Sequence, residues 1–462
     1  MKSIPQNLPP PGKHLCVIEK NQKPDVACPS GAVTAEIGRH IQFNASVLDS
    51  FDVKGFQAVH YDLLILCAAI EFADRRWKRP LSWRRDLLLI VPVIDLETWR
   101  SSEIIRSLKS VLRQLTCDNW DFVFVQAKNR SPIGERQGEL HFAQAKSFAM
   151  GYSEGLDSRA VSALSGDKNE ALCIRVANHR QRRRDGDSYF TQIPFKVKDY
   201  RSNESSFRSR GFQFAAVTAI AAHLSKVERI VVPESGQGAL GPVLLPLHNI
   251  YADYRNHPTF FRMMERFINS VLGCKVRYEQ PRLWSTKGQT LYAFLSLGGK
   301  SESDLTSARS CWQSRRIVNM SGSKKQCGLC AACLLRRLSL QSAGVRESAD
   351  TYVVSDLSIS DVNEALATIR QKADRDIMIE YGSVGTRHLQ HLADMATVPD
   401  SSLRVHVSEI STAIGATHEE TLKNLKALLE AHGQEWTAFL AAQGDHSFLK
   451  SWMDGGRYGR SE

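Results

Sequence analysis

In the first two thirds of the chain, segments with apolar residues at helical spacing alternate with short, continuous apolar runs. Apolar positions recur every three or four residues over 61–72 and 102–116, which places them on one face of a helix. Short apolar runs bounded by polar residues, at 87–94 and 120–127, are typical of buried strands. We therefore expect residues 1–145 to form an N-terminal α/β extension.

The same alternation continues from residue 146 to residue 300. Apolar runs predict strands at 147–152, 171–176, 229–234 and 275–279. Helical spacing predicts helices at 159–164, 212–225 and 259–273. Strands and helices in this order predict an α/β fold with a doubly wound parallel sheet. Ligands of such sheets bind beyond the carboxyl ends of the strands, so the residues that follow each strand are the candidate site.

Beyond residue 345 the pattern becomes helical throughout. Residues 361–373 predict one helix, and Thr417 and Glu420 form a capping box ahead of a leucine-rich helix. We expect residues 346–462 to be a helical region that binds a partner. His388 and His391 are expected to be surface or packing residues.

Four cysteines carry the strongest chemical signal. Cys327, Cys330 and Cys333 are spaced Cys-x-x-Cys-x-x-Cys, and Cys311 lies sixteen positions upstream. Four thiolates can close a tetrahedral cage around Zn²⁺, and Gly328 permits the tight turn, so residues 301–345 predict a zinc-binding element. An iron–sulfur cluster fits less well, because the fourth ligand is remote and the Cys-Pro of the bacterial ferredoxin pattern is missing. Free thiols on a helix are the third alternative.

The second chemical signal is the hexapeptide 153–158, Ser-Glu-Gly-Leu-Asp-Ser, between a predicted strand and a predicted helix. Gly155 permits a sharp turn, the hydroxyls of Ser153 and Ser158 can donate to phosphate oxygens, and the helix start adds positive partial charge. The pattern therefore indicates a phosphate-binding loop. An ordinary serine-capped helix start fits the same residues.

This hexapeptide resembles the signature Ser-Gly-Gly-x-Asp-Ser of the PP-loop ATP pyrophosphatases. Glu154 replaces the first glycine, and a carboxylate beside a triphosphate is unfavourable unless it points away or shares a Mg²⁺. The resemblance implies a HUP/Rossmann-like fold, the use of ATP and Mg²⁺, and a catalytic role for Asp157. The ATP-binding residues that it implies are Ser153, Gly155, Leu156, Asp157 and Ser158.

A PP-loop followed by four cysteines is the arrangement of the 7-cyano-7-deazaguanine synthase (QueC-like) family, which the chain resembles over residues 146–344. The tripeptide 310–312, Ser-Cys-Trp, matches a family element, and 327–336 matches the block Cys-Gly-x-Cys-x-x-Cys-x-x-Arg. The resemblance implies a structural zinc held by Cys311, Cys327, Cys330 and Cys333. It also implies that ATP adenylates a 7-deazaguanine carboxylate, which an amine then captures.

The resemblance gives roles to two further segments. Lys287, within 284–289, is similar to the family's post-strand lysine and is implied to contact phosphate or the activated carboxylate in catalysis. The implied substrate-binding residues are Glu234, Gln237, Asp253 and Arg255, of which the last two resemble a family Pro-Asp-Cys-Arg element without its cysteine. From the residues alone, 234–238 fits a glycine-rich connector equally well, and Lys287 fits a solvated loop lysine.

A branch of QueC-like proteins found in bacterial anti-phage defence operons, including the Qat type, carries extra regions around the same core, and the regions outside 146–344 favour that branch. Some members of that branch are thought to join the deazaguanine acid to a protein amine rather than to ammonia, which implies a partner protein from the same operon. Two alternatives stay open. One is an inactive scaffold in which Glu154 has ended turnover, and the other is a PP-loop enzyme that modifies tRNA.

Composition fits an ordinary globular protein, with 462 residues, 42% hydrophobic and 24% charged. The start lacks a signal peptide and no apolar run is long enough to cross a membrane, so we expect a cytoplasmic protein. The net charge of +11 is concentrated at 175–210, with ten Lys or Arg against four Asp or Glu. We expect a solvated loop there with a steering role. Nucleic acid is not the favoured partner, because interleaved aromatics and a recognised RNA module are missing.

Overall fold

The computed structural model describes residues 12–20, 28–43, 55–81, 84–129, 146–153, 155–167, 169–175, 193–199, 204, 206–245, 251–313, 315–320 and 323–453. Contacts divide the chain into two compact units. The first unit consists of Met1–Ser153, Gly166–Val232 and Asp253–Glu279, and the second of Glu154–Ser165, Pro233–Ala252 and Gln280–Glu462. This division does not test the four domain limits expected from the sequence, and they stay a prediction.

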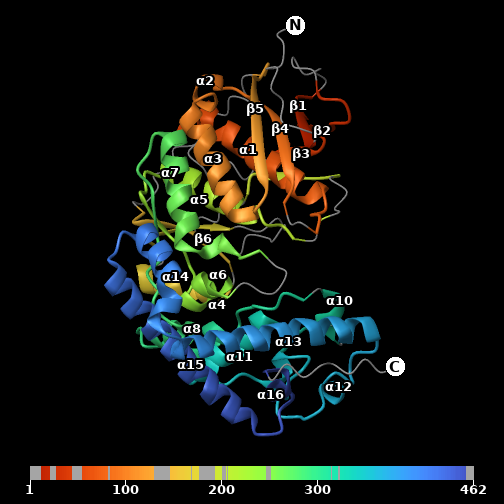
Figure 1. Ribbon diagram of the computed structural model, residues 1–462, viewed down its shortest axis with the longest axis vertical. Helices are drawn as coiled ribbons and strands as arrows, with labels where there is room; N and C mark the ends of the chain where they lie inside the picture. The colour runs from red at the N-terminus through yellow and green to blue at the C-terminus, as the bar shows by residue number, and fades with distance from the viewer. Residues whose placement is uncertain are drawn as a thin grey trace. The chain divides into compact units, whose positions relative to one another are not determined.

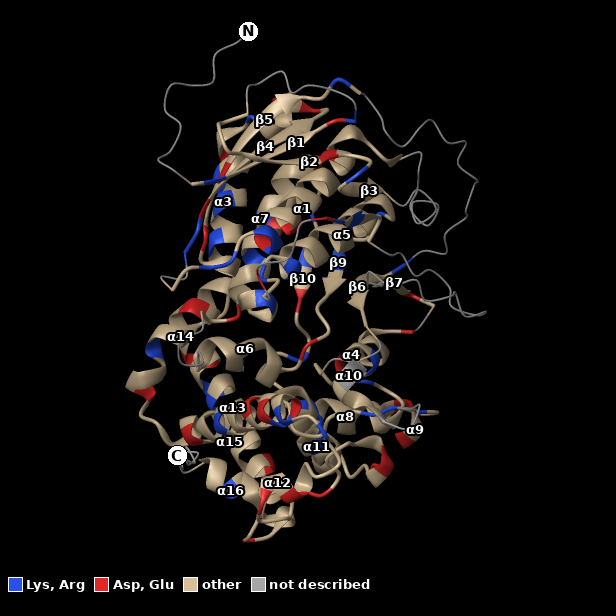
Figure 2. Ribbon diagram, turned by 90° about the vertical axis from the view of Figure 1, so that its right-hand side faces the viewer, with Lys and Arg blue, Asp and Glu red and all other residues tan. Residues whose placement is uncertain are grey.

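The first unit contains two parallel four-stranded sheets, in the orders β2-β1-β4-β5 and β10-β9-β6-β7. The strands of the first sheet are β1 (Lys13–Ile18), β2 (Val33–Glu36), β4 (Asp86–Val93) and β5 (Asn119–Gln126). Those of the second are β6 (Phe148–Tyr152), β7 (Ala171–Arg175), β9 (Arg229–Val231) and β10 (Arg277–Glu279). Strands β1, β4 and β5 carry few charges (Figure 2), and β4 is buried from Leu87 to Val93, as expected of a covered parallel strand.

Four helices fill the space between these sheets: α1 (Ala58–Arg76), α3 (Ser102–Thr116), α5 (Arg210–Leu224) and α7 (Pro258–Leu272). Helices α1 and α3 pack on the first sheet and α5 and α7 on the second, and the two helix pairs also pack on each other (Figure 1). One continuous hydrophobic core results. Helix α1 is apolar nearly all round because it is covered on both sides. The first unit also contains α2 (Leu96–Trp99), η3 (Tyr254–Asn256) and the antiparallel pair β3 (Ile41–Phe43) and β8 (Phe195–Val197).

The second sheet has the strand order of a doubly wound fold. From β6 the chain continues to β7 on one side, and β9 then pairs on the other side of β6. The order therefore reverses between β6 and β9, the point at which ligands bind in open α/β sheets. The segments that leave β6 and β9 along the chain are the first two segments of the second unit.

The second unit is mainly helical, as expected for the C-terminal region. Its helices are α4 (Leu156–Ser165), α6 (Gly236–Leu244), α8 (Lys287–Leu295), α9 (Glu302–Thr306), α10 (Arg315–Val318), α11 (Ala331–Ser342), η4 (Ala349–Thr351), α12 (Val362–Ala365), α13 (Lys372–Asp394), η5 (Met395–Thr397), α14 (Asp400–Ile414), α15 (His418–Gln443) and α16 (Phe448–Met453). A short hairpin, β11 (Asn319–Met320) and β12 (Ser323–Lys324), precedes α11. Three hydrophobic clusters hold these elements together. The parallel sheets and the C-terminal helices confirm the expected fold class.

Most predicted elements are observed within a few residues of the expected bounds, and α3 matches exactly its predicted range. The helix expected over 361–373 is wrong. Helix α12 ends at Ala365, and the backbone bonds from Ala367 to Glu364 and from Ile369 to Leu366 are turns rather than helix. This path buries Leu366 and Ile369 in one cluster, so packing overrides a weak local helix preference. The capping box expected at α15 is confirmed for its Thr417 half, since the Thr417 hydroxyl accepts from the Glu420 amide at 3.1 Å, while the hydrogen bonds of the described residues do not include the return bond to the Glu420 side chain.

Candidate functional site

The four predicted zinc ligands come together in the second unit. The sulfurs of Cys311, Cys327, Cys330 and Cys333 all lie within 4.8 Å of one another, and Cys327 Sγ is 3.7 Å from Cys333 Sγ. Four thiolates around Zn²⁺ at the usual bond length of about 2.3 Å define a tetrahedron with edges of about 3.8 Å. The spacing therefore fits a single zinc ion, whereas a cluster of several iron atoms needs sulfurs farther apart.

Local sequence explains how the chain reaches this geometry. Gly328 has a φ of +86°, and a Cβ there would lie 2.3 Å from the Val354 carbonyl oxygen, so only glycine fits the turn between the first two cysteines of the triplet. Arg309 donates to the carbonyls of Lys324 and Lys325, which ties the Cys311 segment to the end of the hairpin. The turn and the segment that carries the fourth ligand are thus fixed to each other.

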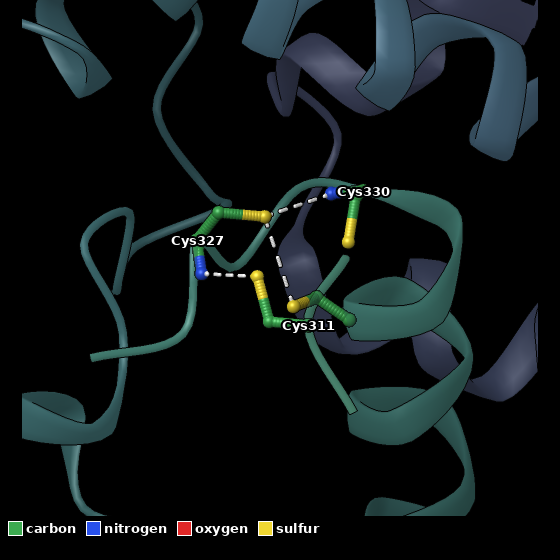
Figure 3. A group of neighbouring side chains, drawn as sticks. Cys311, Cys327 and Cys330 are labelled. Carbon is green, nitrogen blue, oxygen red and sulfur yellow. Dashed lines mark hydrogen bonds between the residues drawn. The ribbon is translucent and has the colours of Figure 1, made fainter. Parts of the chain in front are cut away.

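Backbone amides surround the sulfurs, as is common around metal-bound thiolates. The amide of Cys327 donates to Cys311 Sγ and the amide of Cys330 to Cys327 Sγ, both at 3.2 Å (Figure 3). Cys330 caps α11 and Cys333 lies in its first turn, where the helix dipole stabilises negative charge. Hydrogen bonds from the other three cysteines hold the pKa of Cys311 well below its ordinary value. The cluster could hold a zinc ion.

Three helices of the second unit begin at one point, and this point contains both predicted catalytic residues. Asp157 lies in the first turn of α4, Ser235 is the N-cap of α6, and Lys287 is the first residue of α8. Ser235 Oγ donates to Asp157 Oδ1 at 2.8 Å, and Lys287 Nζ lies 2.5 Å from Asp157 Oδ2. Helix N-termini attract anions, so three of them at one point favour a phosphate group.

Lys287 is not the solvated loop lysine that the residues alone allowed. Its side chain is only 13% exposed, and Thr286 and Gln289 cap the helix reciprocally, with the Thr286 hydroxyl accepting from the Gln289 amide at 3.0 Å. Burial acts to lower the pKa of Lys287, but the carboxylates of Asp157 and Glu234 outweigh it and raise the pKa above its ordinary value. The lysine is therefore a fixed cation.

The other predicted ATP-binding residues have different surroundings. Leu156 is buried in a cluster with Leu291 and Phe294 of α8, which joins α4 to α8. Ser158 is buried and Gly155 half-buried in the second unit, whereas Ser153 is exposed at the end of the strand segment of the first unit. Glu154 lies outside the described residues, as does the basic run 179–184.

Asp253 and Arg255 lie in the first unit and bind each other. Arg255 Nε is 2.9 Å from both oxygens of Asp253, and the Asp253 side chain also accepts from the Arg255 amide at the start of η3. Burial acts to raise the pKa of Asp253, but the hydrogen bonds and charge of Arg255 lower it overall. Asp253 and Arg255 thus form a partly exposed ion pair.

Gln237, predicted to contact substrate, is buried with its amide engaged. Its Oε1 accepts from the Lys287 amide at 2.7 Å, and its Nε2 lies 2.8 Å from His432 Nδ1 and 3.5 Å from Glu435 Oε2. Glu234 lies half-buried beside α6, with its carboxylate close to the Cα of Gly238.

Sequence reasoning missed His432 and Glu435 of α15, and also Ser235. His432 falls on the apolar stripe of α15 together with Leu428, Leu429 and Trp436. A histidine on a buried stripe was the available signal, but it does not reveal the partner. His432 Nε2 is 2.9 Å from the Leu389 carbonyl, and burial lowers the pKa of the ring, so the ring is neutral near pH 7.

Comparison with known families supports the resemblance over part of the chain. Residues 248–344 match the family model for queuosine biosynthesis protein QueC. The matched segment contains Lys287 and all four cysteines, and it supports a relationship to ATP-using PP-loop enzymes of 7-cyano-7-deazaguanine synthesis. No curated protein and no solved structure matches the chain significantly. Among the helices of the described segments, none has the length and apolar character needed to cross a membrane.

The cysteine cluster predicts one zinc ion per chain. Cys330→Ser should remove most of the zinc and lower the midpoint of thermal unfolding by at least about 5 °C, because a metal site that forms only in the folded state stabilises it. Metal analysis and a thermal melt measure both effects. Cys274→Ser, which changes a half-buried thiol of the first unit, is the matched control. Iron and inorganic sulfide in the natural protein would contradict zinc.

Glu435 predicts a pH dependence of stability. Burial raises the pKa of Glu435 from 4.5 to about 7, against opposing hydrogen bonds from Thr286 and Gln237. The folded chain thus keeps a proton that the unfolded chain releases, so ionisation of Glu435 lowers stability as pH rises through this range. Relative to Glu435→Gln, the free energy of unfolding should fall by about 2 kcal/mol between about pH 5 and about pH 8.

Urea denaturation of both proteins at the two pH values measures this difference. The exposed Glu430 of the same helix supplies the control, since Glu430→Gln should give a nearly constant difference from the natural protein. A constant difference for Glu435→Gln would show that its carboxyl ionises as it does in the unfolded chain.

Proposed function

We propose that the protein is an ATP-dependent carbon–nitrogen ligase that adenylates a 7-deazaguanine carboxylate and transfers the acyl group to an amine. The contact among Asp157, Ser235 and Lys287, where three helices begin, is the observation that carries this proposal. Asp157 and Ser235 belong to the segments that follow β6 and β9 along the chain. The QueC match over 248–344 supports the same reaction class.

The proposed reaction has two steps. A carboxylate oxygen attacks the α-phosphorus of ATP and pyrophosphate leaves, and the amine then attacks the acyl carbon and AMP leaves with loss of a proton. Lys287 and the three helix starts supply positive charge where phosphate charge develops, which is the main form of catalysis in such transfers. Asp157 orients the lysine, and its carboxylate offers the oxygen ligands that Mg²⁺ prefers. The zinc has a structural role.

Substrate recognition is proposed for Glu234, Asp253 and Arg255, on the strength of their likeness to the family's substrate segments. Carboxylates and a guanidinium are suited to the donor and acceptor edge of a purine-like base. Gln237, in contrast, has its amide engaged within the protein. We assign it a positioning role instead.

The acceptor amine is proposed to be the amino terminus of a partner protein from the same operon, in anti-phage defence, with ammonia as the other candidate. Long regions outside the QueC-matched segment, 1–247 and 345–462, support this placement. They resemble the additions of the defence branch rather than a minimal biosynthetic enzyme.

Pyrophosphate release tests the reaction. With ATP and 7-carboxy-7-deazaguanine, Lys287→Met and Asp157→Asn should each lower pyrophosphate and AMP formation at least about 100-fold, because each removes charge or orientation needed in the transition state. The exposed pair Lys426 and Asp400, with Nζ and Oδ1 2.8 Å apart, supplies the control. Lys426→Met and Asp400→Asn should stay within about twofold of the natural protein.

Each other outcome of this assay points to a named alternative. No turnover by the zinc-replete natural protein would favour the inactive scaffold, and turnover gained in Glu154→Gly would assign the loss to that residue. Release that requires tRNA instead of the deazaguanine acid would favour the tRNA-modifying alternative.

Mass spectrometry of a co-expressed operon partner tests the acceptor. We expect an adduct of the mass of the deazaguanine acyl group on the partner's amino terminus, lost when Lys287→Met replaces the natural enzyme. An unmodified partner together with free nitrile product would show that ammonia is the acceptor.

A further inference from the structure

We propose that α15 completes the proposed nucleotide site: His432 and Glu435, acting through Gln237 and Thr286, hold the first turn of α8 where Lys287 meets Asp157. This inference rests on the proposed function of Lys287. It assigns the C-terminal helical region a part in the reaction, in addition to the partner binding expected from the sequence. His432 and Glu435 are one helical turn apart, so both face the same side of α15.

Only one assignment of donors and acceptors fits the hydrogen bonds around Gln237. The Leu389 carbonyl can only accept, so His432 carries its proton on Nε2, and Nδ1 must accept from Gln237 Nε2. The Lys287 amide can only donate, so Gln237 Oε1 faces it. The amide of Gln237 is therefore locked in one orientation between α15 and the backbone of the proposed catalytic lysine.

Glu435 orients the cap of α8. The Thr286 hydroxyl donates to Glu435 Oε1 at 2.5 Å, which leaves its lone pairs for the Gln289 amide that it caps. Without Glu435 the hydroxyl is free to rotate, and the cap loses its fixed acceptor. Thr286 is fully buried, so both hydrogen bonds of its hydroxyl are shielded from water, and losing one of them is costly.

The fit of Gly288 shows how closely α8 lies on Glu435. A Cβ at Gly288 would lie 2.5 Å from Glu435 Oε1 and 2.7 Å from the Cβ of Ser342, so the residue after Lys287 can only be glycine here. Farther along α8, Leu291 and Phe294 pack on Leu156 of α4, the helix of Asp157. The body of α8 is thus fixed to α4, and α15 fixes its first turn.

A double-mutant cycle tests whether α15 acts through Lys287. Glu435→Ala and Gln237→Met should each lower kcat about 10- to 100-fold with a smaller change in KM for ATP, because a displaced cation is felt most in the transition state. In the background of Lys287→Met, the same changes should have almost no further effect. Glu435→Gln, whose amide oxygen can accept from Thr286, should recover most of the loss. Glu430→Ala on the exposed face of α15 is the control.

A second measurement does not depend on turnover. Lys287 is acylated in the full chain by an N-hydroxysuccinimide ester, and mass spectrometry of the peptide that contains Lys287, released by proteolysis afterwards, reports how well the lysine is held. The rate of acylation should rise several-fold in Glu435→Ala and Gln237→Met but stay unchanged in Glu430→Ala and close to natural in Glu435→Gln.

The two measurements separate failure of the inference from failure of the proposed function. A natural protein without turnover whose Lys287 nevertheless becomes reactive in both variants refutes the ligase and keeps the positioning role. Unchanged labelling in Glu435→Ala and Gln237→Met, or full multiplication of their effects with Lys287→Met, overturns the positioning role.

Discussion

The proposed site depends on the buried ammonium of Lys287, which lies at the N-terminal end of α8, where a positive charge is unfavourable. An ammonium at the first residue of a helix meets the positive end of the helix dipole, which is unfavourable, and burial adds to the cost. In this protein the carboxylates of Asp157 and Glu234 offset both effects, and the pKa of Lys287 is raised despite burial. A phosphate that approaches this point meets the starts of three helices and an ammonium whose charge the two carboxylates hold in place. The ion pair with Asp157 therefore keeps the ammonium charged and in one place at the starts of the three helices.

Holding such a cation in place requires more than its counter-charge, and the second unit supplies the rest from distant parts of the chain. The backbone of Lys287 is bound by Gln237, and Thr286 is bound by Glu435. The cysteine cluster fixes the start of α11, which packs on α8. The cysteine cluster, the cap of α8 and the buried amide of Gln237 thus all act on one helix. The position of α8 therefore depends on the packing of the whole second unit.

The sequence predicted the parts of the site that short motifs encode. The cysteine spacing predicted that the four cysteines come together, and the serine, glycine and aspartate after β6 predicted the helix start that contains Asp157. It did not predict Glu435, because a glutamate within a helical pattern is usually solvated and its partner Thr286 lies 149 positions away. The end of the helix at α12 was not predicted for a related reason, since burial of Leu366 and Ile369 depends on neighbours that are remote in sequence.

The extent of the second unit determines where the chain can be truncated without breaking its core. A chain ending at residue 344 would keep every residue of the QueC-matched segment and every cysteine ligand. It would nevertheless leave the amide of Gln237 and the hydroxyl of Thr286 without their acceptors, in surroundings built to exclude water. The QueC-matched segment is therefore not an independent module, because side chains of α15 complete the hydrogen bonding of its interior.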